Sequence, residues 1–375
     1  VAPSVVAVRN DEGHGSGMIL NEQGLILTSA HVIVSPLPFQ VEAEGVSRKG
    51  PGLFTFTKVT LVGVHPVRDL ALIQIDPAEH GAKLTPIDFS PSRVLTRDPV
   101  HLIGFPAKYG GRSKIITSGE VTGVDRYVDM PGYFEFSIEA HGGNSGGPAC
   151  SSDGKAVGVL TFGLANGDPV AWAIPLHDFQ PEHFVPLDRR PKDPSKASVL
   201  LRLAEQRLKR AEIGGLREAQ IAETLFKLAV LEDIGNADTY YKIGMIKRNR
   251  DQHAGAAAYL VRSLSLQPWP ESRGMAYHEL GVALVTLGKT AEGVAVWNEG
   301  LAKYPTNGSI LWDALAIWHF DRGEYFKAAV AIRPHSAAAN YLLGVTAQRM
   351  GDLSEATAAL GRAIERDATF ADAHL

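Results

Sequence analysis

The sequence predicts a multidomain protein in which an all-β barrel or sandwich is followed by an all-α region of helical repeats. Up to about residue 180 the apolar stretches are short, rich in β-branched residues and separated by glycine, proline, Asn or Asp. Further along, alanine and leucine recur at three- and four-residue spacing, as amphipathic helices require. We therefore expect a β domain over residues 1–180 and a helical domain over residues 196–375.

Composition and charge exclude several classes of protein. At 375 residues and 45% hydrophobic content, the chain is too long for one ordinary domain and can bury substantial cores. Lys and Arg total 37 and Asp and Glu total 41, without long runs of one sign, which argues against a nucleic-acid partner. Zinc-finger and phosphate-loop spacings do not occur in the sequence, so we expect neither a metal nor a cofactor.

The single cysteine and the opening residues bear on the cellular compartment. Cys150 alone cannot form an internal disulfide framework and is expected to be a small buried hydrophobe. The opening "VAPSVVAVRN" has no basic segment followed by a long apolar run, so we expect neither a signal peptide nor a membrane segment in this chain. A leader removed earlier would leave the same sequence.

The expected strands are separated from the expected helices by a proline-rich segment. The strand-like runs are "SVVAVRN", "SGMIL", "GLILTSA", "LFTFTKVTLVGV", "ALIQID", "VHLIGFP", "GEVTGV", "YFEFSIE", "KAVGVLTFG" and "VAWAIP". The segment "PEHFVPLDRRPKDP" then carries four prolines and several charges, so we expect residues 181–195 to form an extended linker.

Three segments of the helical region repeat one pattern. "ADTYYKIGMIKRNRDQHAGAAAYLVRSLSLQP", "GMAYHELGVALVTLGKTAEGVAVWNEGLAKYP" and "AAANYLLGVTAQRMGDLSEATAALGRAIERDA" each carry an aromatic residue or Asn, then a Leu-Gly or Ile-Gly pair, then a small residue. The pattern resembles the tetratricopeptide repeat, whose small residues let two antiparallel helices approach closely. The small positions are Gly244, Gly281 and Gly344 in the first helices and Ala256, Gly293 and Ala356 in the second.

Two further units are irregular. A degenerate unit precedes the others, with Ala222, Phe226 and Ala229 in register. The unit "GSILWDALAIWHFDRGEYFKAAVAIRP" is about five residues short in its second helix, near residues 323–334. Either this repeat is distorted or a segment is missing from the sequence there.

The strongest chemical motif is "HGGNSGGPAC", residues 141–150. Its glycines and Asn144 let Ser145 lie on a sharp turn, with the hydroxyl exposed and neighbouring backbone N–H groups directed at one point. Such a turn suits a nucleophile beside an oxyanion hole. For this motif alone, the alternative is a glycine-rich hairpin turn.

Two other motifs supply a histidine and an aspartate. "GHGSGMILNEQGLILTSAHVI" places His31 after two short apolar runs, and "VHPVRDLALIQID" places Asp69, expected to be half buried, directly before a strand. Taken alone, His31 suits a hydrogen-bonded core histidine and Asp69 a turn cap. Together with Ser145 they follow the chain order of a chymotrypsin-type triad, with His31 as general base and Ser145 as nucleophile.

With these motifs in place, the β-rich part resembles the trypsin-like serine proteases of the HtrA type. The matching motifs are "GSGMIL", "TSAHVI", "RDLALIQI", "IGFP", "SGEVTGV", "GNSGGPA", "GKAVGVLT" and "AWAIP", which span about residues 4 to 179. The resemblance implies a chymotrypsin-like double six-stranded barrel with the site in the cleft between the barrels. "SGMIL" and "LILTSA" would be paired strands that deliver His31 to that cleft. The backbone N–H groups of Gly143 and Ser145 would form the oxyanion hole.

Glu139 and Thr161 are the candidates for the specificity pocket. Glu139 lies six residues before Ser145, where trypsin-like enzymes place the residue at the pocket floor, and an acid there would favour Lys or Arg. The alternation of "YFEFSIE" instead directs Glu139 outward, together with Glu135 and Ser137. We favour the outward orientation, which predicts small or medium apolar residues before the cleaved bond.

The repeats predict an aromatic stripe that would bind an extended apolar peptide. In tetratricopeptide arrays the residue three before the glycine position faces the concave groove. That position holds Tyr241, His278, Trp312 and Tyr341 in the four units after residue 236. Basic residues that would clamp a terminal carboxylate are missing there. The alternative is that these rings pack against neighbouring helices or cover a self-docked segment such as the linker.

The sequence as a whole predicts a serine endopeptidase whose repeats recruit polypeptide substrates or partners. The alternative is an adaptor or chaperone-like peptide-binding protein with a silent protease domain, although an intact triad favours the enzyme. HtrA-type proteases usually carry PDZ domains instead of these repeats, so substrate tethering and trimer formation do not carry over, and the oligomeric state is left open. A bacterial periplasmic or cell-envelope location follows from family analogy alone, since an intracellular enzyme would have the same sequence.

Overall fold

The structure, a computed structural model, describes residues 2–10, 13–106, 110–124, 132–138, 140–166, 168–304, 309–321 and 337–366. The chain divides into two compact units, Val1–Gly235 and Asn236–Leu375. The first unit therefore contains the β-rich part together with the helices α2 (Pro194–Gly214) and α3 (Leu216–Glu232). This division falls about forty residues beyond the linker expected from the prolines.

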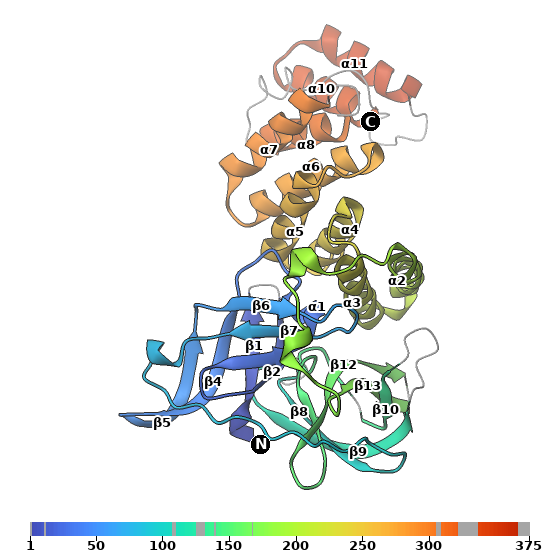
Figure 1. Ribbon diagram of the computed structural model, residues 1–375. Coiled ribbons are helices and arrows are strands. Elements are labelled where there is room, and N and C mark those ends of the chain that lie inside the picture. The colour runs from blue at the N-terminus through green and yellow to red at the C-terminus, as the bar shows by residue number, and fades with distance from the viewer. Residues whose placement is uncertain are drawn as a thin grey trace. The chain divides into compact units, whose positions relative to one another are not determined.

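Two β-sheets make up most of the first unit (Figure 1). The first sheet has seven strands in the order β5-β4-β1-β2-β3-β7-β6. In chain order these are β1 (Val5–Asn10), β2 (Gly13–Ile19), β3 (Leu25–Thr28), β4 (Gln40–Ser47), β5 (Gly50–Phe56), β6 (Thr60–Val64) and β7 (Ala71–Gln74). The β2–β3 pair expected from the sequence is confirmed, with Gly17 opposite Thr28 and Ile19 opposite Ile26.

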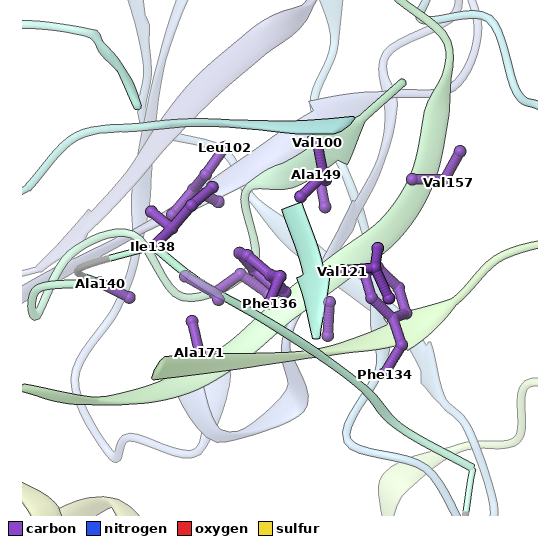
Figure 2. Packing of buried hydrophobic residues seen from close by; sticks show 12 residues of the cluster. Val100, Leu102, Val121, Phe134, Phe136, Ile138, Ala140, Ala149, Val157 and Ala171 are labelled. Atoms are coloured by element: carbon purple, nitrogen blue, oxygen red, sulfur yellow. The ribbon is translucent and has the colours of Figure 1, made fainter. Parts of the chain in front are cut away.

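The second sheet is a closed six-stranded barrel in the order β10-β13-β12-β11-β8-β9. Its strands are β8 (Pro99–Gly104), β9 (Ile115–Val124), β10 (Phe134–Phe136), β11 (Pro148–Cys150), β12 (Ala156–Asn166) and β13 (Asp168–Pro175). Figure 2 shows the apolar side chains that fill it, and the cluster consists of Val100, Leu102, Val121, Phe134, Phe136, Ile138, Ala140, Ala149, Val157, Leu160, Ala171 and Ala173. These alternate residues face one interior, as a closed sheet requires.

The expected double barrel is found only in its second half. In the first sheet, the described strand pairing ends at β5 on one side and at β6 on the other. The free edge of β6 is partly covered by the chain that follows the second barrel, because Val64 and Val185 exchange backbone hydrogen bonds of 2.8 and 2.9 Å. Most of β5 is exposed, so that strand extends beyond the core. A second closed six-stranded barrel is therefore not confirmed.

Three strands, β4, β5 and β6, differ from the sequence pattern. β4 was not among the apolar runs, because only Val41 and Ala43 of "QVEAEGVS" are buried and glutamates separate them. The run "LFTFTKVTLVGV" was treated as one stretch but contains two strands, β5 and β6, which lie at opposite edges of the sheet. Side-chain periodicity identifies a buried face but does not show where a strand ends.

The proline-rich segment is packed rather than freely extended. It forms two 3-10 turns, η4 (Pro181–His183) and η5 (Leu187–Arg189), before α2 begins. Asp193 caps α2 by accepting a hydrogen bond from the Lys196 backbone N–H at 2.9 Å. Its own N–H donates to the Glu232 carbonyl at 3.1 Å, so the start of α2 is fixed to the end of α3.

Seven described helices form the second unit. They are α4 (Ala237–Arg248), α5 (His253–Ser265), α6 (Pro270–Thr286), α7 (Thr290–Lys303), α8 (Ser309–Asp321), α10 (Ala337–Arg349) and α11 (Leu353–Arg366). The small residues lie at close helix contacts as expected: a Cβ on Gly244 would meet Leu260 at 2.8 Å, and one on Gly344 would meet Leu360 at 2.6 Å. The shortened repeat near residues 323–334 lies outside the described residues.

Gly281→Ala is expected to destabilise the second unit. A Cβ there would lie 2.0 Å from Nε1 of the buried Trp297, so the ring or the helix must shift, and such overpacking costs about 1–3 kcal/mol. Gly361→Ala is the matched control, because a Cβ at residue 361 meets nothing within 4 Å. Replacing that helical glycine should stabilise by about 0.5–1 kcal/mol. Urea unfolding followed by circular dichroism measures both, and equal midpoints would contradict the packing.

Candidate active site

The three motif residues come from three elements of the first unit. His31 lies in α1 (Ala30–Ile33), a single helical turn that follows β3. Asp69 lies two residues before β7, and Ser145 lies in the turn before β11. His31 is 5% exposed and Asp69 is 4% exposed. Asp69 is thus buried, not half buried as expected, because its carboxylate is turned inward onto His31.

Asp69 holds His31 at two points. Its Oδ2 lies 2.7 Å from the ring Nδ1, and its Oδ1 accepts the backbone N–H of His31 at 2.8 Å. The Ala30 N–H also donates to the Asp69 carbonyl at 3.2 Å. A carboxylate at Nδ1 assigns the proton of the neutral ring to that nitrogen. Nε2 is then the atom that can accept a proton.

The turn that carries Ser145 has a backbone that only glycine accommodates. Gly143 and Gly146 have φ angles of +97° and +84°. A Cβ on Gly146 would lie 2.1 Å from the Ser16 carbonyl oxygen, and one on Gly143 would lie 2.3 Å from that of Phe105. Both the left-handed conformation and the close packing therefore exclude other residues.

Ser16 of strand β2 holds this turn through hydrogen bonds. The Ser16 N–H donates to the Ser145 carbonyl at 2.7 Å, and the Ser16 hydroxyl donates to the Gly143 carbonyl at 2.8 Å. That hydroxyl also accepts the Phe105 N–H at 3.0 Å. The N–H groups of Gly143 and Ser145 donate to no acceptor among the described residues, whereas those of Asn144 and Gly146 donate to the His141 and Leu160 carbonyls at 3.1 and 2.8 Å.

Two adjacent carbonyls of β12 bring the serine turn and the histidine to one place. Ser29, two residues before His31, donates its hydroxyl hydrogen to the Leu160 carbonyl at 2.9 Å. The Ser145 hydroxyl donates to the next carbonyl, that of Thr161, at 2.9 Å. Segments far apart in the sequence are therefore held on the same short stretch of strand.

Of the two candidates for the specificity pocket, the structure describes Thr161 but not Glu139. Thr161 is fully buried beside Ser145, and its side-chain hydroxyl has no hydrogen-bond partner among the described residues. Glu139 lies outside the described residues, so neither of its two orientations is tested.

The site also uses residues that the sequence motifs did not single out. Ser16 lies within the quoted "GSG", but nothing in the sequence shows that it binds two other loops. His14 lies against the serine turn: its Nε2 is 2.7 Å from the Phe105 carbonyl and 2.4 Å from the place where a Cβ on Gly143 would lie. Burial lowers the pKa of His14, so the ring is neutral there.

Three further properties of the described residues concern metal binding, the reactivity of Cys150 and membrane-spanning helices. No group of three or more His, Cys, Asp or Glu among them could hold a metal ion. Cys150 is buried as expected, and burial raises the pKa of its thiol to about 12, so it is not a nucleophile. Within the described ranges, no helix has the length and apolar character needed to cross a bilayer.

The four predicted groove residues of the second unit are all partly exposed. Tyr241 packs against the core cluster that includes Ala256 and Leu280, and Trp312 packs against the cluster that includes Trp297. Part of each ring therefore belongs to the helix packing, while the remainder is accessible. Both sequence interpretations of this stripe remain in place.

The turn between β6 and β7 presents Asp69 and depends on a neutral histidine. Nδ1 of His65 accepts the backbone N–H groups of Val67 at 3.2 Å and Arg68 at 3.1 Å. Burial, followed by the charge of Arg68, lowers the pKa of His65 to about 4. A protonated Nδ1 could not accept either hydrogen bond.

His65→Asn is expected to make the protein less sensitive to acid. An unfolded histidine titrates near 6.5 and the folded one at about 4, so between these values only the unfolded chain binds the proton. The free energy of unfolding of the wild type therefore decreases as the pH falls from about 6.5 to about 4. Asn accepts the same N–H groups without titrating. Thermal unfolding of the wild type and the variant across this pH range checks the effect, and His80→Asn, at an exposed histidine, is the control. The prediction is contradicted if the stability of the wild type and of His65→Asn depends on pH to the same extent.

Two domain families match parts of the chain. Residues 15–159 match the trypsin-like peptidase domain, and residues 237–268 and 337–370 match the tetratricopeptide repeat. The serine protease Do-like HtrA of Bacillus subtilis is 33% identical over 188 residues, which cover 46% of this chain and 38% of that protein. The putative serine protease HhoA of Synechocystis is 27% identical over 176 residues, covering 45% and 41%.

Part of the chain is also similar to solved structures. The crystal structure of Deg5 is 28% identical, covers 47% of this chain and 85% of its own, and has a TM-score of 0.39. The chain spans only about two fifths of the length of the curated relatives named above, at 38% and 41%. The β-rich part of the chain is therefore similar to the trypsin-like peptidase domain of HtrA-type serine proteases, and two segments of the helical part match the tetratricopeptide repeat.

Proposed function

We propose that the chain is a serine endopeptidase that hydrolyses peptide bonds through Ser145, His31 and Asp69. The observation that carries this proposal is the buried His31–Asp69 pair, in which one carboxylate binds the ring at 2.7 Å and the backbone of the same residue at 2.8 Å. This arrangement fixes the tautomer in which Nε2 can take a proton from a serine. Two relatives are named as serine proteases, HtrA of Bacillus subtilis and the putative protease HhoA of Synechocystis, which supports the same reaction class.

The residues divide the reaction between them. Ser145 Oγ attacks the scissile carbonyl carbon while its proton passes to His31 Nε2. The oxyanion accepts hydrogen bonds from the Gly143 and Ser145 N–H groups, each of which typically contributes about 3 kcal/mol to transition-state stabilisation. His31 then donates the proton to the leaving amine, and water hydrolyses the acyl-enzyme with His31 again as base.

Before the first step the serine hydroxyl must rotate. It donates to the Thr161 carbonyl at 2.9 Å, and attack requires that it donate to His31 instead. Catalytic hydrogen bonds often form only when substrate binds, so this arrangement is compatible with the proposed role. Thr161 would then lie at the wall of the specificity pocket, and the outward orientation of Glu139 would favour small apolar residues before the cleaved bond.

The repeats are proposed to bind polypeptides through the accessible parts of Tyr241, His278, Trp312 and Tyr341. The match to tetratricopeptide repeats indicates protein–protein interaction, and an aromatic stripe suits an extended apolar peptide. For the location we propose a bacterial periplasm or cell envelope, since one relative is named a probable periplasmic DegP-like endoprotease.

Ser145→Ala is expected to abolish both fluorophosphonate labelling and peptide cleavage, because no other group can form the acyl-enzyme. Ser152→Ala, an exposed serine in a nearby loop, is the matched control and should label like the wild type. Gel fluorescence and peptide hydrolysis measure the two activities. A wild type that neither labels nor cleaves would favour the adaptor or chaperone-like alternative.

His31→Ala and Asp69→Ala should each lower kcat by orders of magnitude, and the double variant should be little worse than either. The reason is that Asp69 acts through His31, so removing the second partner of a broken pair changes little. Steady-state kinetics of the two single variants and the double variant test this. Multiplicative losses would show that the residues act separately.

Trp312→Ala should weaken binding of an extended apolar peptide by about 2 kcal/mol, the size expected for an aromatic anchor. Trp269→Ala is the control, since Trp269 is 71% exposed and lies outside the stripe. Fluorescence titration measures the affinity, and circular dichroism confirms that both variants stay helical. Equal affinities of a folded Trp312→Ala variant and its control would remove the stripe as a binding site.

A further inference from the structure

The turn that presents Asp69 is held by side chains from beyond the second barrel. Arg190 Nε donates to the Pro66 carbonyl at 3.2 Å, and Lys196 Nζ donates to the Val67 carbonyl at 3.3 Å. Arg190 follows η5 and Lys196 lies in the first turn of α2. Two consecutive carbonyls, two and three residues before Asp69, are therefore fixed by two cations of the helical segment.

The same segment holds the turn at its edges. Val185 pairs with Val64, the last residue of β6, through backbone hydrogen bonds of 2.9 and 2.8 Å. Asp178 forms a bidentate pair with Arg68 at 2.8 and 2.5 Å. Each contact lies within five residues of Asp69, so the position of its backbone depends on chain that follows the barrel.

A buried charge cluster lies behind these contacts. Arg190 is 6% exposed, and its Nη2 lies 3.1 Å from Glu232 Oε1 at the end of α3. Lys196 Nζ lies 2.7 Å from the same oxygen, and Glu232 is 5% exposed. Burial lowers the pKa of Arg190, while the negative charges of Glu232 and then Asp69 raise it. The guanidinium is thus within the electrostatic range of two buried carboxylates.

The helix pair also approaches His31. The short helix α1, which carries His31, packs against α3, and Figure 1 shows the two side by side. Asp69, Arg190 and Glu232 line one small cavity together with Tyr133, Lys196, Leu200, Leu228 and Leu231. Both members of the His31–Asp69 pair therefore contact or face the region formed by α2 and α3.

We propose that Arg190 is a positioning residue of the protease site and that, with Glu232 and Lys196, it makes the α2–α3 pair part of the catalytic scaffold. This inference rests on the proposed function, because it takes Asp69 and His31 as members of the triad. Arg190 fixes the backbone before Asp69 and offsets the charge of two buried carboxylates. Without it, the buried Asp69 loses a compensating positive charge, and the turn that positions Asp69 against the imidazole loses its hydrogen bond at the Pro66 carbonyl.

The test compares four variants of the full chain by kcat, KM, the pH profile of kcat/KM and thermal unfolding. Arg190→Met removes the charge and the hydrogen bonds, Arg190→Lys keeps the charge, and Glu232→Gln removes the opposite charge at similar volume. Arg207→Met is the matched control, since Arg207 pairs with Glu218 at 3.2 Å and joins the same two helices. It breaks an α2–α3 ion pair without any contact to the Asp69 turn.

Removing the positive charge and removing the negative charge should shift the pH profile in opposite directions. Arg190→Met should lower kcat by about tenfold or more with little change in KM, because misplaced catalytic groups slow chemistry more than binding. The acidic limb of its pH profile should move to higher pH, because the surroundings of Asp69 lose a positive charge. Glu232→Gln should move the limb to lower pH. Arg190→Lys keeps the positive charge, so its acidic limb should lie at the same pH as that of the wild type.

The remaining outcomes separate the inference from the proposed function. If Arg190→Met does not fold, the test uses the other two variants. The acidic limb of Glu232→Gln should then move to lower pH, while that of Arg190→Lys should stay at its wild-type position. If the wild type labels with fluorophosphonate and every variant matches Arg207→Met in kcat and in its acidic limb, the inference is overturned and the proposed function stands. If Ser145 of the wild type does not label, the proposed function fails and the inference with it.

Discussion

The burial of the Asp69 carboxylate is the constraint on which the rest of the first unit depends. A buried carboxylate loses several kcal/mol of hydration and persists only where donors and positive charge replace the water. Here the replacement comes from the imidazole and backbone of His31, at 2.7 and 2.8 Å, and from the field of Arg190. The short helix α1 and the helices after the second barrel are therefore arranged around one side chain.

The serine turn meets a different requirement, which is set by the backbone. Ser16 of β2 holds the turn by donating to the Ser145 and Gly143 carbonyls and accepting the Phe105 N–H, while the N–H groups of Gly143 and Ser145 have no acceptor among the described residues. The left-handed conformation of Gly143 and Gly146 makes the reversal of direction accessible. The two halves of the site thus rely on different physics, electrostatic compensation on one side and backbone conformation on the other.

Local motifs predicted the elements whose function is local. The glycines around Ser145, the paired strands before His31 and the small residues at Gly244 and Gly344 follow from short-range rules of turns and close helix contacts, and the structure bears them out. Contacts between distant segments have no such signature. Nothing in "PLDRRPKD" distinguishes the buried Arg190 from the exposed Arg189, because burial depends on Glu232, forty-two residues further along.

The same reasoning explains the two differences in architecture. The resemblance to HtrA-type proteases implied a closed six-stranded first barrel, which the seven-stranded first sheet, with β5 and β6 at its edges, does not confirm. Alternation alone does not give strand order. The boundary of the first unit was expected at the prolines, because proline marks breaks in helices and strands. A proline-rich segment can still pack when its side chains and carbonyls find partners, as Val185 and Arg190 do.

The backbone pairing of Val64 with Val185 has a consequence for how this protein can be divided. A fragment that ended where the strands end would leave the edge of β6 uncovered, and an open strand edge is a site for intermolecular pairing and aggregation. It would also leave the Asp69 turn without its outer supports. The first compact unit, which keeps all of these contacts, ends at Gly235, so exchange of the helices that follow would leave the contacts intact beyond that residue.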